Sequence, residues 1–505
     1  MPAHYPISSV PEVGGRIPAD SVHAVSVSLP RVSDVIGYEE KISETMSRIQ
    51  SGYPRFVAHP YVTAIVDYFQ NLSHSDRPCV VVSSDAAAED LFSWSGYRGK
   101  AHCIEEDGIV AFPLPEDESL SSHLLSYIQH TGCLVSSRRA EDFLLARNLI
   151  SSVQKEDRIT EQPGQRVSEE MARLNGVPSK DAILSVSGMN SVYAAFRAMH
   201  ELQKRKGRTV WIQLGWLYVD NIRIVEKFTE DPVVIYQMDS LESIKEALRT
   251  NKNVAGIITE VPTNPLLQTA DLVELYEVAA ESGCMVLSDI SVGSSVCINA
   301  ISHSDVVVES LTKFASGSGD VMMGAAIINP DSAFYSELRP LVERYVEAPY
   351  ISDLERLAYR IQDYEERMSR IDSSVKTIKS SLRNHPAVAQ LFCADEGPCA
   401  ANYLRIAKRS VSGEPYSGGM ISLQIRGNMQ SVYDSLDLLK GPSFGTDFTL
   451  VMLYLYLAHY ELVSRPEGVQ KLKSLGMDPG LFRVSVGLED PETLLQRFEQ
   501  SLAKA

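Results

Sequence analysis

The stretch Glu309-Ser310-Leu311-Thr312-Lys313-Phe314, continued by Ala315-Ser316-Gly317-Ser318-Gly319-Asp320, decides how this 505-residue chain is interpreted. It follows the apolar run Val306 to Val308, which predicts a buried strand, so Lys313 lies just beyond a strand end. The hydroxyl groups of Ser310 and Thr312 stand close before the lysine, and the glycines after it let backbone approach a ligand. The pattern is typical of a lysine that anchors a ligand covalently. Taken alone, it is more often an ordinary surface lysine after a strand.

A second strand-like run supports the ligand interpretation. Residues 283–290 predict a short buried strand that ends near Asp289, and ligands in open α/β sheets bind beyond the carboxyl ends of the strands. A carboxylate at that edge suits the ring nitrogen of pyridoxal phosphate, because it keeps the nitrogen protonated and strengthens the ring as an electron sink. Lys313 would form a Schiff base with this cofactor, and Ser310 and Thr312 would help to hold its phosphate. The alternative for Asp289 is a helix cap or a loop.

Two further segments point to the same sheet edge. Residues 254–261 predict a strand that carries Glu260, and the proline-stiffened turn after it carries Asn264. An amphipathic helix expected after Asp271 completes a strand, loop, helix, strand unit, which implies a parallel sheet. Earlier in the chain, Ser187-Gly188-Met189 stands between an apolar run and a helix-like stretch. A helix N-terminus with free backbone amides is a phosphate-binding site.

In this order the motifs resemble the cystathionine γ-synthase family of pyridoxal-phosphate enzymes, which have fold type I. The matching segments are Ser187-Gly188-Met189, Glu260 to Leu266, Ser288-Asp289, Glu309 to Phe314 and Leu481 to Asp490. Residues 21–55 are also similar to the longer N-terminal part of the fungal-type branch. The resemblance implies an α/β fold in which a large domain with a mainly parallel, seven-stranded sheet carries a smaller C-terminal α+β domain.

The resemblance also implies roles for residues at the matching positions. Lys313 would be the Schiff-base lysine and proton shuttle, and Asp289 would face the ring nitrogen. The other cofactor-binding residues that it implies are Asn264 at the ring hydroxyl, Gly188 and Met189 through their amides, and Ser310 and Thr312 at the phosphate. Arg483 matches the arginine that holds the substrate α-carboxylate, a task that suits a planar guanidinium. Ser443 falls at a substrate-binding serine of the family, within a run that differs from the family pattern. We expect no metal site.

Near the N-terminus, Tyr53-Pro54-Arg55 matches a family Tyr-x-Arg that reaches the cofactor phosphate of a neighbouring subunit. The resemblance therefore implies a homodimer or homotetramer with shared active sites. Standing alone, the tripeptide would be a turn on an exposed loop. The family also stacks an aromatic ring on the cofactor after the strand expected at residues 210–214. Trp216 and Tyr218 are both candidates for that ring, and either is equally suited to the core.

The chain departs from the family pattern in its length and in one loop. About 130 residues separate Tyr53-Pro54-Arg55 from Ser187-Gly188-Met189, and strand-like and helix-like runs such as Val80 to Val82 and Ala86 to Phe92 fill the interval. The domains that we expect are an N-terminal arm (1–60), an inserted α/β segment (61–180), a cofactor-binding large domain (181–351) and a C-terminal domain (352–505). The loop 216–221 lacks an arginine that many members place near the substrate, so the preferred substrate side chain is left open.

Composition favours a soluble metabolic enzyme. The net charge of −18 argues against nucleic acid or an anionic membrane surface as partner, because both would repel this chain. Seven cysteines without a Cys-x-x-Cys pair fit reduced thiols, and we find no apolar run long enough for a membrane span or a signal core. These features predict a cytoplasmic protein, and the resemblance implies small-molecule amino-acid substrates.

The reaction that the resemblance implies is a γ-substitution. Cysteine would replace the leaving group of an activated homoserine ester to give cystathionine, on the route to methionine. A γ-lyase, a homoserine sulfhydrylase or a secondary-metabolism synthase with another nucleophile are alternatives within the same chemistry. A non-catalytic relative is disfavoured, because Lys313, Asp289, Asn264 and Arg483 are all present.

Overall fold

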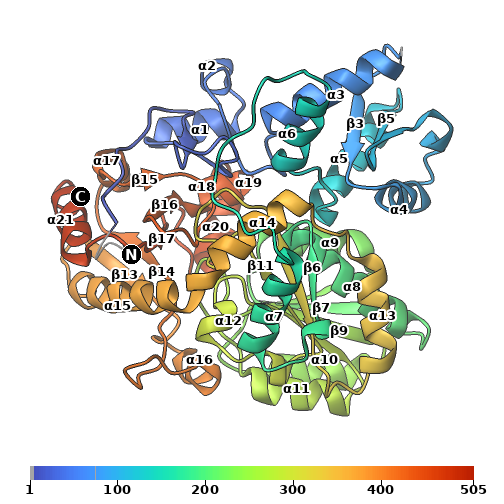
Figure 1. The fold of residues 1–505 in the computed structure, drawn as a ribbon. Helices are drawn as coiled ribbons and strands as arrows, with labels where there is room; N and C mark the ends of the chain where they lie inside the picture. The colour runs from blue at the N-terminus through green and yellow to red at the C-terminus, as the bar shows by residue number, and fades with distance from the viewer. Residues whose placement is uncertain (1–4, 74) are drawn as a thin grey trace.

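The largest sheet of the computed structural model, which describes residues 5–73 and 75–505, has seven strands (Figure 1). They lie in the order β6-β12-β11-β10-β9-β7-β8. Their bounds are β6 (Ala182–Ser185), β7 (Val210–Leu214), β8 (Val233–Ile235), β9 (Val254–Glu260), β10 (Met285–Asp289), β11 (Val306–Ser310) and β12 (Gly324–Ile328). All neighbouring strands are parallel except β12, which runs antiparallel to both of its neighbours. The predicted mainly parallel, seven-stranded sheet is confirmed.

Helices cover both faces of this sheet. Successive side chains of each strand point to opposite faces, and both faces carry apolar side chains that the helices bury. On β9, Ile257 enters the core on one face and Ile258 enters the core on the other. The helices around the sheet are α7 (Pro163–Asn175), α8 (Gly188–Lys204), α9 (Val219–Phe228), α10 (Glu242–Thr250), α11 (Leu272–Glu281), α12 (Ser294–Cys297) and α13 (Tyr335–Tyr345). The carboxyl ends of β9, β10 and β11 therefore open at one edge, where Glu260 and Asp289 lie side by side and Ser310 follows two positions after Val308, the β11 partner of Asp289.

The C-terminal part forms a second sheet, in the order β13-β14-β17-β16-β15. Its strands are β13 (Val388–Phe392), β14 (Met420–Ile425), β15 (Leu439–Lys440), β16 (Leu450–Leu453) and β17 (Phe482–Ser485). Its helices are α14 (Ile351–Arg360), α15 (Tyr364–Leu382), α16 (Ala400–Ile406), α17 (Met429–Ser435), α18 (Tyr454–Ala458), α19 (Tyr460–Val463), α20 (Pro466–Ser474) and α21 (Pro491–Leu502). This is the smaller α+β unit that we expected.

The N-terminal arm lies on this second sheet (Figure 1). It contains the strand pair β1 (Arg16–Ile17) and β2 (Ser26–Val27) and the helices α1 (Val32–Glu39) and α2 (Ser43–Met46). Ile17 is buried with Leu439, Phe448 and Leu450, and the Tyr433 hydroxyl donates to the carbonyl oxygen of Leu29 at 3.1 Å.

The inserted segment has a three-stranded antiparallel sheet of its own, in the order β3-β5-β4. The elements are α3 (Pro60–Ser73), β3 (Cys79–Val82), α4 (Asp85–Ser95), β4 (Ile104–Glu106), β5 (Ile109–Pro113), α5 (Glu118–Thr131) and α6 (Ser137–Ala146). One face buries a small core that includes Phe69 and Phe143, while Phe112 on the other face packs toward Phe196 of α8. Helix α7, which we placed at the end of this segment, packs in the core of the large sheet instead. The expected domain boundaries stay a prediction.

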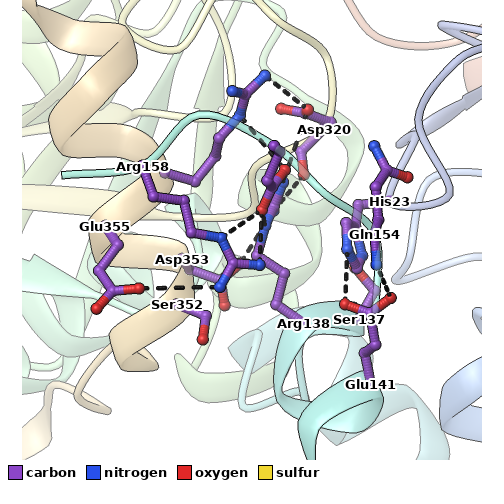
Figure 2. A network of polar contacts seen from close by, with 12 residues as sticks. His23, Ser137, Arg138, Glu141, Gln154, Arg158, Asp320, Ser352, Asp353 and Glu355 are labelled. Carbon is purple, nitrogen blue, oxygen red and sulfur yellow. Dashed lines mark hydrogen bonds and ion pairs between the residues drawn. The ribbon is translucent and has the colours of Figure 1, made fainter. Parts of the chain in front are cut away.

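A buried charge network joins these parts (Figure 2). Arg138 of α6 is 1% exposed and binds Glu156 through two hydrogen bonds of 2.7 Å. The same guanidinium lies 3.2 Å from an Asp353 oxygen and 3.6 Å from an Asp320 oxygen. The network therefore fixes the inserted segment to the loop after Lys313 and to α14.

All seven cysteines are free thiols. Within residues 5–73 and 75–505, no helix combines the length and the apolar character that crossing a bilayer requires.

Candidate active site

A cavity of about 390 Å³ lies at the edge where β9, β10 and β11 end. Its walls come from the large domain, the C-terminal domain and the N-terminal arm. The sequence-predicted residues that line it are Tyr53, Arg55, Gly188, Met189, Tyr218, Asn264, Asp289, Ser310, Lys313, Ser443 and Arg483. Residues that lie far apart in the sequence thus meet around one lysine.

Lys313 is buried, and no carboxylate of the described residues lies against its amine. Its Nζ donates to Ser443 Oγ at 2.8 Å and lies 4.4 Å from the centre of the Tyr53 ring. Burial lowers the pKa of Lys313; Tyr53 opposes this shift and the nearby Arg483 adds to it. Burial would raise the pKa of Tyr53, but Lys313 and Arg55 hold it below its ordinary value. A lysine with a lowered pKa is a better nucleophile and base near neutral pH than an exposed one.

Two acids lie side by side where β9 and β10 end. Glu260 is the register partner of Asp289, and Asn221 donates from Nδ2 to both, at 2.9 and 3.0 Å. Burial raises the pKa of Asp289, although the Asn221 amide and the Ser291 backbone counteract this effect. Burial and the Asp289 charge raise the pKa of Glu260 well above its usual range. The pair therefore favours a neutral Glu260 beside an Asp289 that is available to face a cationic ring nitrogen.

The N-terminus of α8 forms the opposite wall. Ser187 caps the helix by accepting from the Asn190 amide at 3.1 Å, so the first amides of the helix, from Gly188 and Met189, point out of its end. A Cβ on Gly188 would lie 2.6 Å from Ser310 Cβ, and glycine is therefore required for this close approach. The buried hydroxyl oxygen of Ser310 has no hydrogen-bond partner among the described residues. An anion at this helix end would satisfy it.

Thr312 does not belong to this anion-binding position at the N-terminus of α8. Its hydroxyl lies within the protein and accepts from the Met323 amide at 3.2 Å, and it is not part of the cavity wall. The side chain is turned to the backbone of the neighbouring segment because the strand has already ended at Ser310 and the chain bends there.

The structure separates the two aromatic candidates. Tyr218 lines the cavity, and its hydroxyl accepts from Arg55 Nη2 at 2.5 Å. Trp216 is 7% exposed, packs with Leu266 and Leu455, and donates from its indole nitrogen to His459 at 3.2 Å. Trp216 is thus a core residue in this fold, and the assignment of a cofactor-facing role to it is corrected.

Tyr53 and Arg55 line the cavity of their own chain. Arg55 forms an ion pair with Asp220 and lies 5.3 Å from the centre of the Tyr218 ring. The approach of a neighbouring subunit's arm, which the resemblance implies, stays a prediction.

Arg483 on β17 contrasts with Arg55, because no carboxylate pairs with it among the described residues. Its Nη2 donates to the Ser443 carbonyl oxygen, its guanidinium lies 5.1 Å from the centre of the Phe444 ring, and its Nε has no partner there. Burial lowers the pKa of Arg483 to about 10. A buried arginine without a counter-ion is suited to a ligand carboxylate.

Sequence reasoning missed Asp220 and Asn221. They hold Arg55 and Asp289 respectively, yet they lie in the loop that departs from the family pattern. The available signal was their position directly after Tyr218 on the start of α9. Tyr454, which lies 5.3 Å from Arg483 (ring centre to Cζ), carried no sequence signal.

The site and fold define a pyridoxal-phosphate enzyme. Asn264 Oδ1, Ser310 Oγ and Arg483 Nε are buried polar atoms without partners in the described chain, and they surround a buried lysine. Residues 152–503 match the family described as Cys/Met metabolism PLP-dependent enzyme, and the chain belongs to this family. The predicted cofactor, pyridoxal phosphate, is therefore confirmed.

Relatives cover nearly the whole chain. It is 36% identical to the L-2-amino-4-chloropent-4-enoate dechlorinase/desaturase of Streptantibioticus cattleyicolor, over 95% of this chain and 96% of that protein. It is 28% identical to the cystathionine γ-synthase of Neurospora crassa, over 98% of each. The expected similarity to fungal members is thus confirmed, and a bacterial relative shares more identity.

A solved structure shows the same fold. The cystathionine γ-synthase from Xanthomonas oryzae pv. oryzae, in complex with cystathionine, superposes with a TM-score of 0.58 at 20% identity. The similarity covers 68% of this chain and 86% of that one.

Proposed function

We propose that this enzyme replaces a leaving group at the γ-carbon of an L-α-amino acid, with cysteine as nucleophile, so that an activated homoserine ester yields cystathionine. The observation that carries the proposal is the placement of Lys313 and the unpaired Arg483 in one cavity. They would hold a substrate carboxylate within reach of a base.

The cofactor fits the residues of this cavity. Gly188, Met189 and Ser310 would hold its phosphate, Asp289 its ring nitrogen and Asn264 its ring hydroxyl. When bound, it withdraws electrons from the substrate and so acidifies the protons at Cα and Cβ.

The chain's own residues supply binding and proton transfer. Arg483 would grip the α-carboxylate and so fix the Cα–H bond toward Lys313. The Lys313 amine would take the Cα proton and move one at Cβ, because its lowered pKa leaves it partly neutral. Ser443 would hold the amine in place between these steps through its 2.8 Å contact.

The mouth of the cavity favours a second amino-acid substrate. Glu39 and Lys41 from the arm and Glu461 from α19 line the same cavity as Lys313. This set offers a cation for a carboxylate and anions for an ammonium group, which a cysteine nucleophile needs. Burial, together with the charge of Glu461, raises the pKa of Glu39 to about 7, so ammonium binding at the mouth would strengthen as the pH rises through 7.

A second candidate function is elimination at the γ-carbon without an added nucleophile. The 36% identity to a dechlorinase/desaturase supports it. In that case a γ-chloro, unsaturated α-amino acid would lose chloride, and the charged groups at the mouth would serve only to close the cavity.

The test is to incubate the enzyme and pyridoxal phosphate with an O-acyl-homoserine, with and without cysteine, and to identify products by mass spectrometry. Cystathionine that forms only with cysteine would support the proposal. Formation of 2-oxobutyrate at the same rate in both would overturn it. A parallel incubation with L-2-amino-4-chloropent-4-enoate, read by chloride release, tests the second candidate.

The control variant is Lys41→Gln. It removes the cation at the mouth and leaves Lys313 and Arg483 intact. If the reaction is a γ-substitution, Lys41→Gln raises the KM for cysteine and leaves the KM for the ester unchanged. If the reaction is an elimination, Lys41→Gln has no specific effect on either KM.

A further inference from the structure

A second cavity of about 380 Å³ lies between the inserted segment and the large domain. Its walls come from α4 and α5 on one side, and from α8 and the residues around the end of α13 on the other. None of its lining residues lines the lysine cavity. Its volume is within the range of small-molecule sites.

The floor of this second cavity is rigid and polar. The Asp90 carboxylate accepts from the Tyr127 hydroxyl at 2.6 Å and from the Tyr193 hydroxyl at 2.5 Å. Arg197 lies 3.4 Å from the other Asp90 oxygen, so this acid is already neutralised. The floor therefore offers shape and hydroxyl groups rather than free charge.

The free charges are on the wall. Glu347 accepts from the Ser83 hydroxyl at 2.9 Å and attracts Arg139 electrostatically, but it forms no ion pair within 4 Å among the described residues. Arg344, three positions earlier, is exposed and attracts Glu201 electrostatically, but it forms no ion pair within 4 Å in that part of the chain, and its guanidinium lies 5.7 Å from the Tyr345 ring centre. Glu89 at the rim is paired with Lys100. One carboxylate and one guanidinium that form no direct ion pair among the described residues thus line the same cavity.

This pair of charges selects a ligand class. A small molecule with one ammonium and one carboxylate group satisfies both, and the cavity leaves room for a side chain against Ala86, Ala87 and Cys133. A phosphate ester would bring more negative charge than Arg344 alone balances. A neutral metabolite would form no ion pair with either charge.

The first turn of α8 separates the two cavities. Asn190 faces the second cavity; its Oδ1 accepts from the Glu347 amide at 2.8 Å, and its Nδ2 donates to the Thr131 carbonyl oxygen at 3.4 Å. Gly188 and Met189, in the same turn, line the lysine cavity. A ligand that draws Glu347 or Arg344 inward therefore acts on the turn that would hold the cofactor phosphate.

We propose that this second cavity binds a free α-amino acid and that its occupancy changes the affinity of the first turn of α8 for the cofactor. The binding itself does not rest on the proposed reaction, whereas the coupling rests on the assignment of the cofactor's phosphate to α8.

The test uses the full-length holoenzyme with Arg483→Ala as background, because loss of Arg483 removes the amino-acid grip of the lysine cavity. Calorimetric titration with L-alanine, L-cysteine, L-methionine and L-lysine as probes gives the stoichiometry. We expect one equivalent per chain for at least one probe, and weakening by about tenfold or more in Glu347→Gln and in Arg344→Gln. The matched control is Glu343→Gln on α13, which pairs with Arg339 on the surface and leaves binding unchanged.

Two outcomes overturn the proposal: none of the four amino acids binds in the Arg483→Ala background, or Glu347→Gln and Arg344→Gln both bind like their parent. Coupling is read separately, in the Arg483→Ala background, as the difference between the cofactor dissociation constants measured with and without the amino acid. By linkage, the cofactor must change amino-acid affinity by the same factor. Equal constants overturn the coupling and leave the binding site standing.

Discussion

Two of the regions that bury arginine in this molecule treat it in opposite ways. At the junction of the inserted segment, Arg138 faces Glu156, Asp320 and Asp353, and the arginines and aspartates labelled in Figure 2 lie against opposite charges. In the lysine cavity, Arg483 is as deeply buried but has only a carbonyl oxygen, a sulfur atom and aromatic rings around it.

The difference distinguishes an arginine that stabilises the fold, Arg138, from an arginine that is available to a ligand, Arg483. Burial of a charge is costly unless it is paired, so a fold that only needed stability would have paired Arg483 or replaced it. The pairing of Arg138 strengthens the junction between parts of the chain. The unpaired state of Arg483 leaves a place for a ligand anion, and the predictions below test that contrast.

The largest effect is expected at Lys313. Lys313→Ala removes the proposed cofactor anchor and base together, and we expect turnover to fall by on the order of 10⁴-fold. Steady-state kinetics measures it, with circular dichroism to check that the fold is kept. Retention of near wild-type turnover would contradict the assignment.

Arg138→Met tests the paired region. It leaves Asp353 buried without its cation, while Glu156 keeps Arg158 and Asp320 keeps Arg356, so we expect the free energy of unfolding to fall by about 3 kcal/mol. Urea unfolding measures the change. Arg483→Met is the matched substitution and leaves no acid unpaired, so its stability should stay within about 1 kcal/mol of wild type or rise. Equal losses at both positions would remove the distinction between the regions.

Arg483→Lys tests the unpaired region. The lysine keeps the positive charge but cannot form the bidentate contact, so we expect kcat/KM for the amino-acid substrate to fall by about 10²-fold, mostly through KM. Initial-rate kinetics over a range of substrate concentrations separates the two constants. An unchanged KM would mean that another residue holds the carboxylate.

The smallest effect concerns the pH dependence of stability and the buried His130 near Arg55. Burial lowers the pKa of His130 to about 4, although Asp220 opposes this shift. Between that pKa and the ordinary value near 6.5, the unfolded chain binds more protons, so stability falls as the pH falls through this window. His130→Gln should flatten the dependence by at most about 1.4 kcal/mol per pH unit.

Urea unfolding at several pH values between about 4.5 and 7 measures this slope. His102→Gln, the same substitution at an exposed position, serves as the control. A slope that His130→Gln does not alter would show that His130 binds its proton equally well in the folded and the unfolded protein.

The sequence alone determined the chemistry of the site. Lys313, Asp289, Asn264 and Gly188 follow predicted strands or begin a helix, and strand ends in a parallel sheet meet at one edge, so local patterns suffice to bring them together. The parallel sheet and the separate C-terminal unit follow from the same periodicity.

Only the tertiary structure decided which side chains face the cavity. Trp216 and Tyr218 are two residues apart in a loop, where no periodicity predicts direction, and the packing of α18 and α19 takes Trp216 into the core. Thr312 turns to Met323 because a hydroxyl after a strand end pairs with whichever backbone lies nearest. The partners Asp220 and Asn221, and the second cavity beside α8, depend on contacts between segments up to 264 positions apart, which no local pattern records.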